Sequence, residues 1–90
     1  MHYVYILKSK INGDIYVGFS NDLKTRFGQH NSGKVKSTQA YKPWILVYYE
    51  AYLDKKDATS REKQLKNHAA KNVLKIQIKN SIGFENDKIG

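Results

Sequence analysis

The chain has 90 residues, the size of a single small domain. It contains no cysteine, which excludes disulfides and thiolate metal sites and fits a reducing compartment such as the cytoplasm. Its 16 Lys and Arg residues face 8 Asp and Glu, and the net charge of +8 is typical of a protein that meets a polyanion such as nucleic acid, although charge alone also fits general solubility. No apolar run approaches the roughly 20 residues of a membrane span, so we expect a soluble, cytoplasmic protein without a membrane segment.

Three segments have the composition of β-strands. Residues 3–7 (YVYIL) are apolar or aromatic at both alternating sets of positions, which predicts a central strand covered on both faces. Residues 14–19 (DIYVGF) and 44–51 (WILVYYEA) are the second and third strands. The aromatic side chains in and just after the third segment are expected to pack within the fold: Trp44, Tyr48, Tyr49 and Tyr52.

The first two strands are expected to form a hairpin. Asn12-Gly13 between them favours a two-residue type I′ turn, which needs positive φ at both central residues. That turn would set the register of the two strands and pair Leu7 with Gly18.

Two tyrosines and a glycine share one face of the predicted hairpin. Side chains alternate along a strand, so Tyr5 and Tyr16 lie on the same side as Gly18, and the residues of the other side are purely apolar. Gly18 would leave the backbone open beside the two hydroxyls, which explains a glycine inside a strand. The alternative is that both tyrosines are ordinary strand residues and Gly18 marks a bulge or a notch for helix packing.

Three helices are predicted, the first two from their capping residues. Ser20 or Asn21 can cap a helix that runs to about Asn31, and Asp54 can cap the next one. A third helix is expected over residues 69–79. The predicted order is strand, strand, helix, strand, helix, helix, an α+β fold in which three helices flank a three-stranded antiparallel sheet.

Basic residues gather in a loop and on the second predicted helix. The loop runs from Lys34 to Pro43, and loops that are long for so small a domain are often functional. The candidates for contacts with nucleic acid are Lys34, Lys36, Lys42, Arg61, Lys63 and Lys66. Residues 1–80 are expected to form the domain, and residues 81–90, where the apolar periodicity is lost, a frayed tail.

Arg26 and His30 lie one turn apart on the first predicted helix and project from the same side, toward the tyrosine face. Arg26 is a forked donor that suits phosphate oxygens, or else a solvated cation. His30 can donate to phosphate or relay a proton, or else it is a helix-end histidine favoured by the dipole.

Glu62 places a carboxylate in the stripe of the second helix that should face the core, between Ala58 and Leu65. It is the one carboxylate expected to reach the tyrosine face, where its oxygens would suit a hard cation such as Mg²⁺. The alternative is a routine i,i+4 pair with Lys66, worth roughly a few tenths of a kcal/mol.

Several motifs resemble the GIY-YIG nuclease domain, and most closely its small stand-alone bacterial members. The matching stretches are YVYIL at 3–7, YVGFS at 16–20, DLKTRFGQHNSG at 22–33, KPWILVYYEAY at 42–52 and SREKQLKNH at 60–68. Together they span roughly residues 2–80. Tyr3 replaces the first glycine of the family pattern and Phe19 a lysine of some members, whereas both tyrosines and Gly18 are kept.

The resemblance implies a metal-dependent endonuclease that hydrolyses DNA phosphodiester bonds with one Mg²⁺ or Mn²⁺ ion held by Glu62. Tyr16 would orient or deprotonate the attacking water, and Tyr5 would hydrogen-bond near the water and the phosphate. Arg26 would stabilise charge on the scissile phosphate, with His30 completing the implied catalytic set.

The resemblance leaves some points open. A family asparagine on the last helix corresponds to Asn67 or Asn72, and the sequence gives no basis for choosing. We expect weak sequence specificity and a preference for branched or flapped DNA of the repair and recombination type. Two other interpretations are a catalytically silent nucleic-acid-binding module on the same scaffold and a basic ribosome- or RNA-associated protein.

Overall fold

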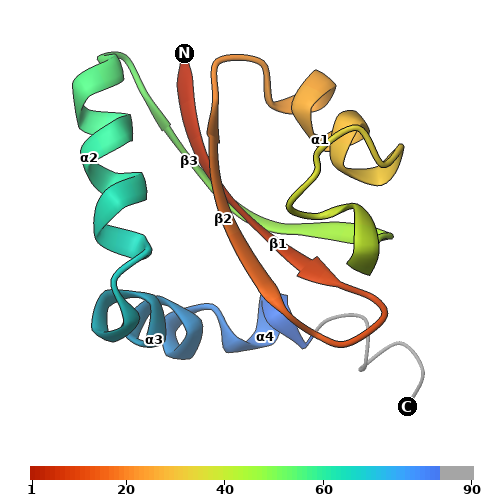
Figure 1. Ribbon diagram of the computed structural model, residues 1–90. Coiled ribbons are helices and arrows are strands. Elements are labelled where there is room, and N and C mark those ends of the chain that lie inside the picture. Colours follow the sequence, from red (N-terminus) through yellow and green to blue (C-terminus); the bar gives the residue numbers. More distant parts are fainter. Residues whose placement is uncertain (84–90) are drawn as a thin grey trace.

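An antiparallel sheet of three strands runs through the middle of the molecule, in the order β2-β1-β3 (Figure 1). The structure, a computed structural model, describes residues 1–83. The strands are β1 (His2–Ser9), β2 (Ile15–Ser20) and β3 (Trp44–Tyr52). The predicted α+β class is confirmed, and so is the central position of the first strand.

The helices lie on both sides of the sheet, with α1 on one side and α2 on the other (Figure 1). They are α1 (Leu23–Asn31), the short 3₁₀ helix η1 (Gln39–Tyr41), α2 (Lys55–Leu65), α3 (His68–Gln77) and α4 (Lys79–Ile82). Within residues 1–83, no helix is long and apolar enough to cross a lipid bilayer.

The last predicted helix is divided in two. Helix α3 ends at Gln77, because Ile78 leaves the helical region with φ −110° and ψ 27°, and α4 begins at Lys79. Residues 81 and 82, predicted to fray, belong to α4. The rest of the predicted tail, residues 84–90, lies outside the described residues.

The helix caps agree with the sequence in part. Asp54 caps α2 as predicted, and its Oδ1 accepts from the Lys56 amide at 2.7 Å. The predicted cap of α1 is wrong. Asp22 caps that helix by accepting from the Thr25 amide at 3.2 Å, because the Ser20 hydroxyl already accepts from the Asp22 amide one step earlier.

The predicted two-residue turn of the hairpin is also wrong. Residues 10–13 form a four-residue loop, closed by a 2.8 Å bond from the Ser9 amide to the Asp14 carbonyl. Only Gly13 has a positive φ, of 78°, so the turn is not type I′. The Ser9 hydroxyl accepts from the amides of Ile11 and Asn12, which closes the longer loop from within.

The longer loop moves the strand pairing by two residues. Tyr5 lies opposite Gly18, and Leu7 lies opposite Tyr16 instead of Gly18. A shift by two residues keeps every side chain on its face of the sheet, whereas a shift by one would have exchanged the faces. Both tyrosines therefore share a face with Gly18, as the alternation predicted.

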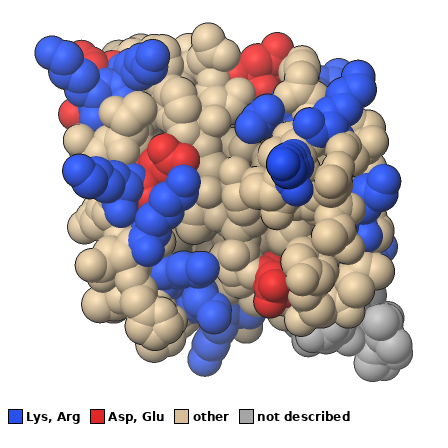
Figure 2. All heavy atoms as spheres, viewed as in Figure 1, with Lys and Arg blue, Asp and Glu red and all other residues tan. Residues whose placement is uncertain are grey.

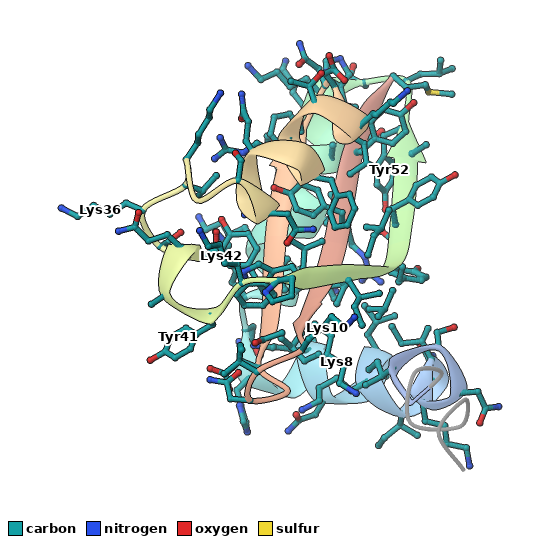
Figure 3. The ribbon with its side chains drawn as sticks, turned by 90° about the vertical axis from the view of Figure 1, so that its right-hand side faces the viewer. Lys8, Lys10, Lys36, Tyr41, Lys42 and Tyr52 are labelled. Carbon is teal, nitrogen blue, oxygen red and sulfur yellow. The ribbon has the colours of Figure 1, made fainter. Side chains whose placement is uncertain are left out.

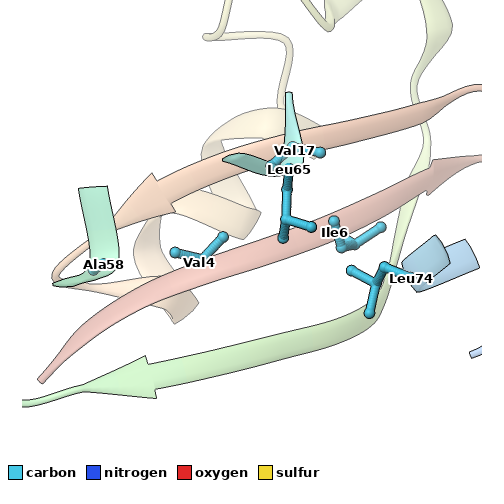
Figure 4. Close-up of a cluster of buried hydrophobic side chains, with 6 residues drawn as sticks. All are labelled: Val4, Ile6, Val17, Ala58, Leu65 and Leu74. Atoms are coloured by element: carbon cyan, nitrogen blue, oxygen red, sulfur yellow. The ribbon is translucent and has the colours of Figure 1, made fainter. Parts of the chain in front are cut away.

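Each face of the sheet covers its own core. The face toward α2 and α3 is aliphatic (Figure 4), with the buried side chains Val4, Ile6, Val17, Ala58, Leu65 and Leu74. The face toward α1 buries Tyr5, Leu7 and Trp44 and packs against the half-buried Tyr16 and Phe27. The expected packing of Trp44 is confirmed, since only 5% of it is exposed, whereas that of Tyr49 is wrong, since 53% of it is exposed. The aromatic core supports the candidate site.

Candidate active site

A buried chain of hydrogen bonds begins at Tyr5, of which only 1% is exposed. The Tyr5 hydroxyl lies 2.8 Å from His30 Nε2, and His30 Nδ1 lies 2.8 Å from the Thr38 hydroxyl. Thr38 Oγ1 in turn donates to the Val35 carbonyl at 3.3 Å. Because that bond uses the threonine proton, Thr38 accepts from His30 Nδ1–H, and Nε2 accepts from the Tyr5 hydroxyl.

The electrostatics of this chain favour its neutral form. Burial, and to a smaller extent the charge of Arg26, lower the pKa of His30 to about 4. Burial raises the pKa of Tyr5 to about 12, against the lowering effect of its hydrogen bond with Arg26. At neutral pH, therefore, His30 carries no charge and Tyr5 keeps its proton, which is directed at the imidazole.

Tyr16 stands beside the chain and is only half-buried. Its ring makes an edge contact with His30 at a centroid distance of 5.0 Å and also packs near Tyr5 and Trp44. Among residues 1–83 the Tyr16 hydroxyl has no hydrogen-bond partner. The phenol is thus held by rings and keeps a free polar end.

The space above Gly18 is filled, not open as the sequence suggested. A Cβ at this position would lie 2.7 Å from Cε2 of Tyr5 and closer still to its Cζ and Oη. No real Cβ tolerates such contacts, so only glycine lets the Tyr5 ring lie across the facing strand. Gly18 therefore serves the placement of Tyr5 and does not leave a gap for another group.

Arg26 lies on α1 at the border of this site. Its Nη1 donates to Gln29 Oε1 at 3.1 Å, and its guanidinium is near enough to the Tyr5 hydroxyl to lower the pKa of that tyrosine. Within the described part of the chain it forms no ion pair with a carboxylate. Arg26 therefore presents an uncompensated forked cation beside the two tyrosines.

Glu62 lies on α2, on the other side of the sheet from α1. Its charge is the weakest of the influences on the raised pKa of Tyr5, after burial, Arg26 and Tyr16, and it forms no hydrogen bond with the tyrosines within residues 1–83. The i,i+4 pair that the sequence left open is present, with Lys66 Nζ at 3.2 Å, and 24% of the Glu62 side chain is exposed. A surface pair of this kind is weak and exchanges easily.

The donor set for a cation is sparse. No group of three or more His, Cys, Asp or Glu residues converges anywhere within residues 1–83. Mg²⁺ often takes one or two protein carboxylates and completes its shell with water and substrate phosphate. A single partly exposed carboxylate at Glu62 fits that pattern and does not fit an ion caged by protein ligands alone.

Comparison with known proteins settles the family. A sequence model of the GIY-YIG catalytic domain matches residues 1–76. This chain belongs to the GIY-YIG family. The resemblance read from the motifs is therefore confirmed, and membership places the chain in a nuclease-type family whose substrate class is DNA.

Relatives of the GIY-YIG chain are small bacterial proteins. It is 38% identical over 76 residues to the UPF0213 protein SH2523 of Staphylococcus haemolyticus, covering 83% of this chain and 92% of the relative. It is 39% identical over 87 residues to the UPF0213 protein CPE1444 of Clostridium perfringens, covering 96% and 92% of the two. The solution NMR structure of the UPF0213 protein BH0048 from Bacillus halodurans matches with a TM-score of 0.53 at 37% identity, over 81% of this chain and 80% of that one.

The basic residues of this GIY-YIG domain divide into free and engaged groups. Lys34, Lys36 and Lys42 are exposed, and Lys36 projects from its loop away from the body of the molecule (Figure 3). Lys63 is also exposed. Figure 2 shows lysine and arginine on both flanks and at the lower edge of the face where β2 lies in front, with some acidic side chains among them and a mainly uncharged surface in the middle.

Arg61, by contrast, is engaged inside the molecule. Its Nε lies 2.9 Å from Glu50 Oε1, its Nη2 lies 3.0 Å from Glu50 Oε2, and its Nη1 donates to Gln64. The guanidinium fork is therefore occupied by a carboxylate of β3. Lys66 is paired with Glu62, so of the three basic residues predicted on α2 only Lys63 is free of such a pair within residues 1–83.

Sequence reasoning missed two polar residues of this GIY-YIG domain. Thr38 lies in a loop and completes the hydrogen-bonded chain of Tyr5 and His30. No local sequence pattern predicts this role. Glu50 interrupts an apolar strand between Tyr48 and Tyr52, which was a usable signal for a buried partner. Neither candidate asparagine bonds to the tyrosines, since Asn67 caps α3 and Asn72 contacts His68.

Proposed function

We propose that this chain is a metal-dependent endonuclease that hydrolyses phosphodiester bonds in DNA. Its family membership supports a nuclease. The observation that carries the proposal is a half-buried phenol with a free hydroxyl, Tyr16, on the same side of the sheet as an arginine without a carboxylate partner, Arg26. Structural side chains of these types are ordinarily paired, and unpaired ones at a surface suit a ligand.

The two tyrosines take different roles in this proposal. Tyr5 is not available as a base at neutral pH, because its pKa of about 12 keeps it protonated and its hydroxyl is bonded to His30. It therefore positions Arg26 and His30. Tyr16 faces the substrate and orients the attacking water or, in its deprotonated form, takes the proton of that water. The reaction forms a bond from the water oxygen to phosphorus and breaks the bond from phosphorus to the 3′ oxygen.

Arg26 and Glu62 handle charge in the proposed reaction. Arg26 donates to the non-bridging oxygens of the scissile phosphate, where negative charge grows. Glu62 would hold one Mg²⁺ or Mn²⁺ ion together with water and phosphate oxygens. When bound, such an ion neutralises charge at the phosphate and at the leaving 3′ oxygen. Release of Glu62 from Lys66 costs little, since an i,i+4 pair contributes about 0.3–0.5 kcal/mol.

The substrate is proposed to be branched or flapped DNA, bound with little preference for base sequence. Exposed lysines contact phosphates and supply affinity without base readout. Lys34, Lys36, Lys42 and Lys63 are the proposed contacts. Arg61 is the weakest of the predicted contacts, because Glu50 already occupies its fork.

A nicking assay with Mg²⁺ or Mn²⁺ on linear, flapped and branched DNA tests the proposal. Glu62→Gln and Tyr16→Phe should each lower cleavage by about 100-fold or more and keep DNA binding. Asp57→Asn on the same helix and Tyr41→Phe on η1 are matched controls and should cleave like the parent.

The outcomes of that assay separate the interpretations. Binding with no cleavage under either metal would make the chain a catalytically silent binding module. A preference for RNA, with no effect of the Glu62 or Tyr16 variants, would make it a basic RNA-associated protein. Cleavage confined to one short sequence would contradict the proposed substrate class.

A further inference from the structure

A polar hollow lies beside the candidate site, where the start of β1, the end of β2 and the first turns of α1 and α2 meet. Its volume is about 350 Å³, and it is lined by His2, Phe19, Ser20, Asn21, Arg26 and Lys55. Its lining has two cations, a hydroxyl, an amide and an imidazole, and no carboxylate. Arg26 belongs both to this hollow and to the tyrosine site.

The positive charge of the hollow is not neutralised. Neither Arg26 nor Lys55 forms an ion pair with a carboxylate among residues 1–83. The nearby acid Asp54 uses its carboxylate to cap α2. Two uncompensated cations on one hollow repel each other unless an anion lies between them. The hollow is therefore suited to an anion with several oxygen acceptors.

A second, independent observation points to a ligand. Nδ1 of His2 is buried and has no hydrogen-bond partner within the described residues. The ring stacks on Phe19 with a centroid distance of 6.2 Å and an interplanar angle of 7°, which fixes its plane. A buried polar atom without a partner is uncommon and calls for a ligand or a water.

We propose that this hollow binds the backbone phosphate next to the scissile one on the same DNA strand. The inference rests on the proposed function, because Arg26 is the residue that contacts the scissile phosphate there. Lys55 supplies the second positive charge, and His2, Ser20 and Asn21 supply polar groups for the phosphate oxygens. This subsite would fix the direction in which the strand crosses the tyrosines.

DNA binding without metal tests the subsite independently of cleavage. Lys55→Ala should reduce the slope of log K against log salt by about one, as the loss of one phosphate contact requires. Lys56→Ala is the matched control, because Lys56 lies one position away on α2, is exposed and does not line the hollow. Equal slope changes in the two variants would overturn the proposal.

Single methylphosphonate substitutions in the DNA locate the contact. Each removes one phosphate charge, and the position whose effect disappears in Arg26→Ala marks the phosphate held by that arginine. The neighbouring position should lose its effect in Lys55→Ala. If the Lys55 effect maps instead to a 5′-terminal phosphate, or to no position, the proposal is wrong.

A third variant tests the histidine. His2→Phe keeps the stack on Phe19 and removes Nδ1, so DNA affinity should fall by about three- to tenfold without loss of stability. Unchanged affinity would exclude His2 from the subsite. If the protein cleaves no DNA but Lys55 still contributes a phosphate contact to binding, the subsite is supported and the nuclease is refuted. If the protein cleaves DNA but Lys55 contributes no phosphate contact, the nuclease is supported and the subsite is refuted.

Discussion

Two groups of tyrosines in this fold differ in their hydrogen-bond partners. In the first, Tyr5 bonds to His30 on the α1 side of the sheet, in a chain without a carboxylate. In the second, Tyr48 and Tyr52 each donate to Glu50, at 2.5 Å. Burial is the first cause of the raised pKa in Tyr5 and in Tyr52, about 12 for both. Tyr52 owes the rest to its bond with Glu50.

The difference lies in what each group leaves unpaired. Burial opposes ionisation of Glu50, but hydrogen bonds from Arg61 and the two tyrosines lower its pKa. Glu50 therefore stays charged, and both of its oxygens accept hydrogen bonds. This closed network fastens β3 to α2. The chain at Tyr5 ends beside two groups that lack such partners, the Tyr16 hydroxyl and the Arg26 guanidinium. Closed networks stabilise a fold, and open ones bind ligands.

The largest effect is expected from breaking the closed network. Glu50→Ala would leave Arg61, with 26% of its side chain exposed, without its carboxylate, and should lower the free energy of unfolding by about 3 kcal/mol. Urea unfolding measures this. The double variant Glu50→Leu/Arg61→Leu removes both charges and should recover most of the loss. A loss below about 1 kcal/mol in Glu50→Ala would show that the network is not structural.

The Arg61 variants also correct an error of sequence interpretation. Arg61 looked like a phosphate contact because it stands in a basic run on α2. Its partner Glu50 lies eleven positions earlier on another element, and no local spacing connects the two. Pairing across elements is set by tertiary packing. A sequence therefore shows which charges exist, but not which of them are neutralised.

The placement of the tyrosines was predictable for a physical reason. Alternation along a strand assigns Tyr5 and Tyr16 to one face, and the two-residue error in the hairpin register left that assignment intact. The meaning of Gly18 was not predictable, because it depends on the Tyr5 ring, which lies across the strand at this position. The face on which a strand residue lies can be predicted from the local alternation of side chains. Which side chain fills the space above a glycine depends on the rotamer of a neighbouring residue, which the sequence does not show.

Gly18→Ala tests whether the Tyr5 ring fills the space above residue 18, and it should destabilise the protein. The added Cβ collides with the Tyr5 ring, and overpacking of this kind costs about 1–3 kcal/mol. Gly28→Ala on α1 is the control, because nothing lies within 4 Å of its added Cβ, and it should stabilise by about 0.5–1 kcal/mol. Equal stability of the two variants would mean that the ring moves aside freely.

Acid should weaken the hydrogen-bonded group of Tyr5, His30 and Thr38 and so lower the stability of the protein. The folded pKa of His30, about 4, lies below the ordinary value of 6.5, so the unfolded state binds a proton first. This contribution to stability is complete above about pH 6.5 and is lost as the pH falls toward 4, by at most about 1.4 kcal/mol per pH unit. Urea unfolding at several pH values measures how the free energy of unfolding changes with pH. This change should be smaller in His30→Gln and unaltered in His68→Gln, because His68 lies exposed on α3. The same change with pH in both variants would contradict a neutral buried His30.

The smallest effects should come from single phenols of the closed network. Tyr48→Phe and Tyr52→Phe each remove one of several donors to Glu50, and each should cost about 1 kcal/mol in urea unfolding. The double variant should cost more than the sum, because Glu50 then depends on Arg61 alone. Cleavage of DNA should be unchanged in both single variants, since neither phenol belongs to the tyrosine site. Loss of cleavage with retained stability would place the Glu50 network within the catalytic machinery, and the division between open and closed groups would not hold.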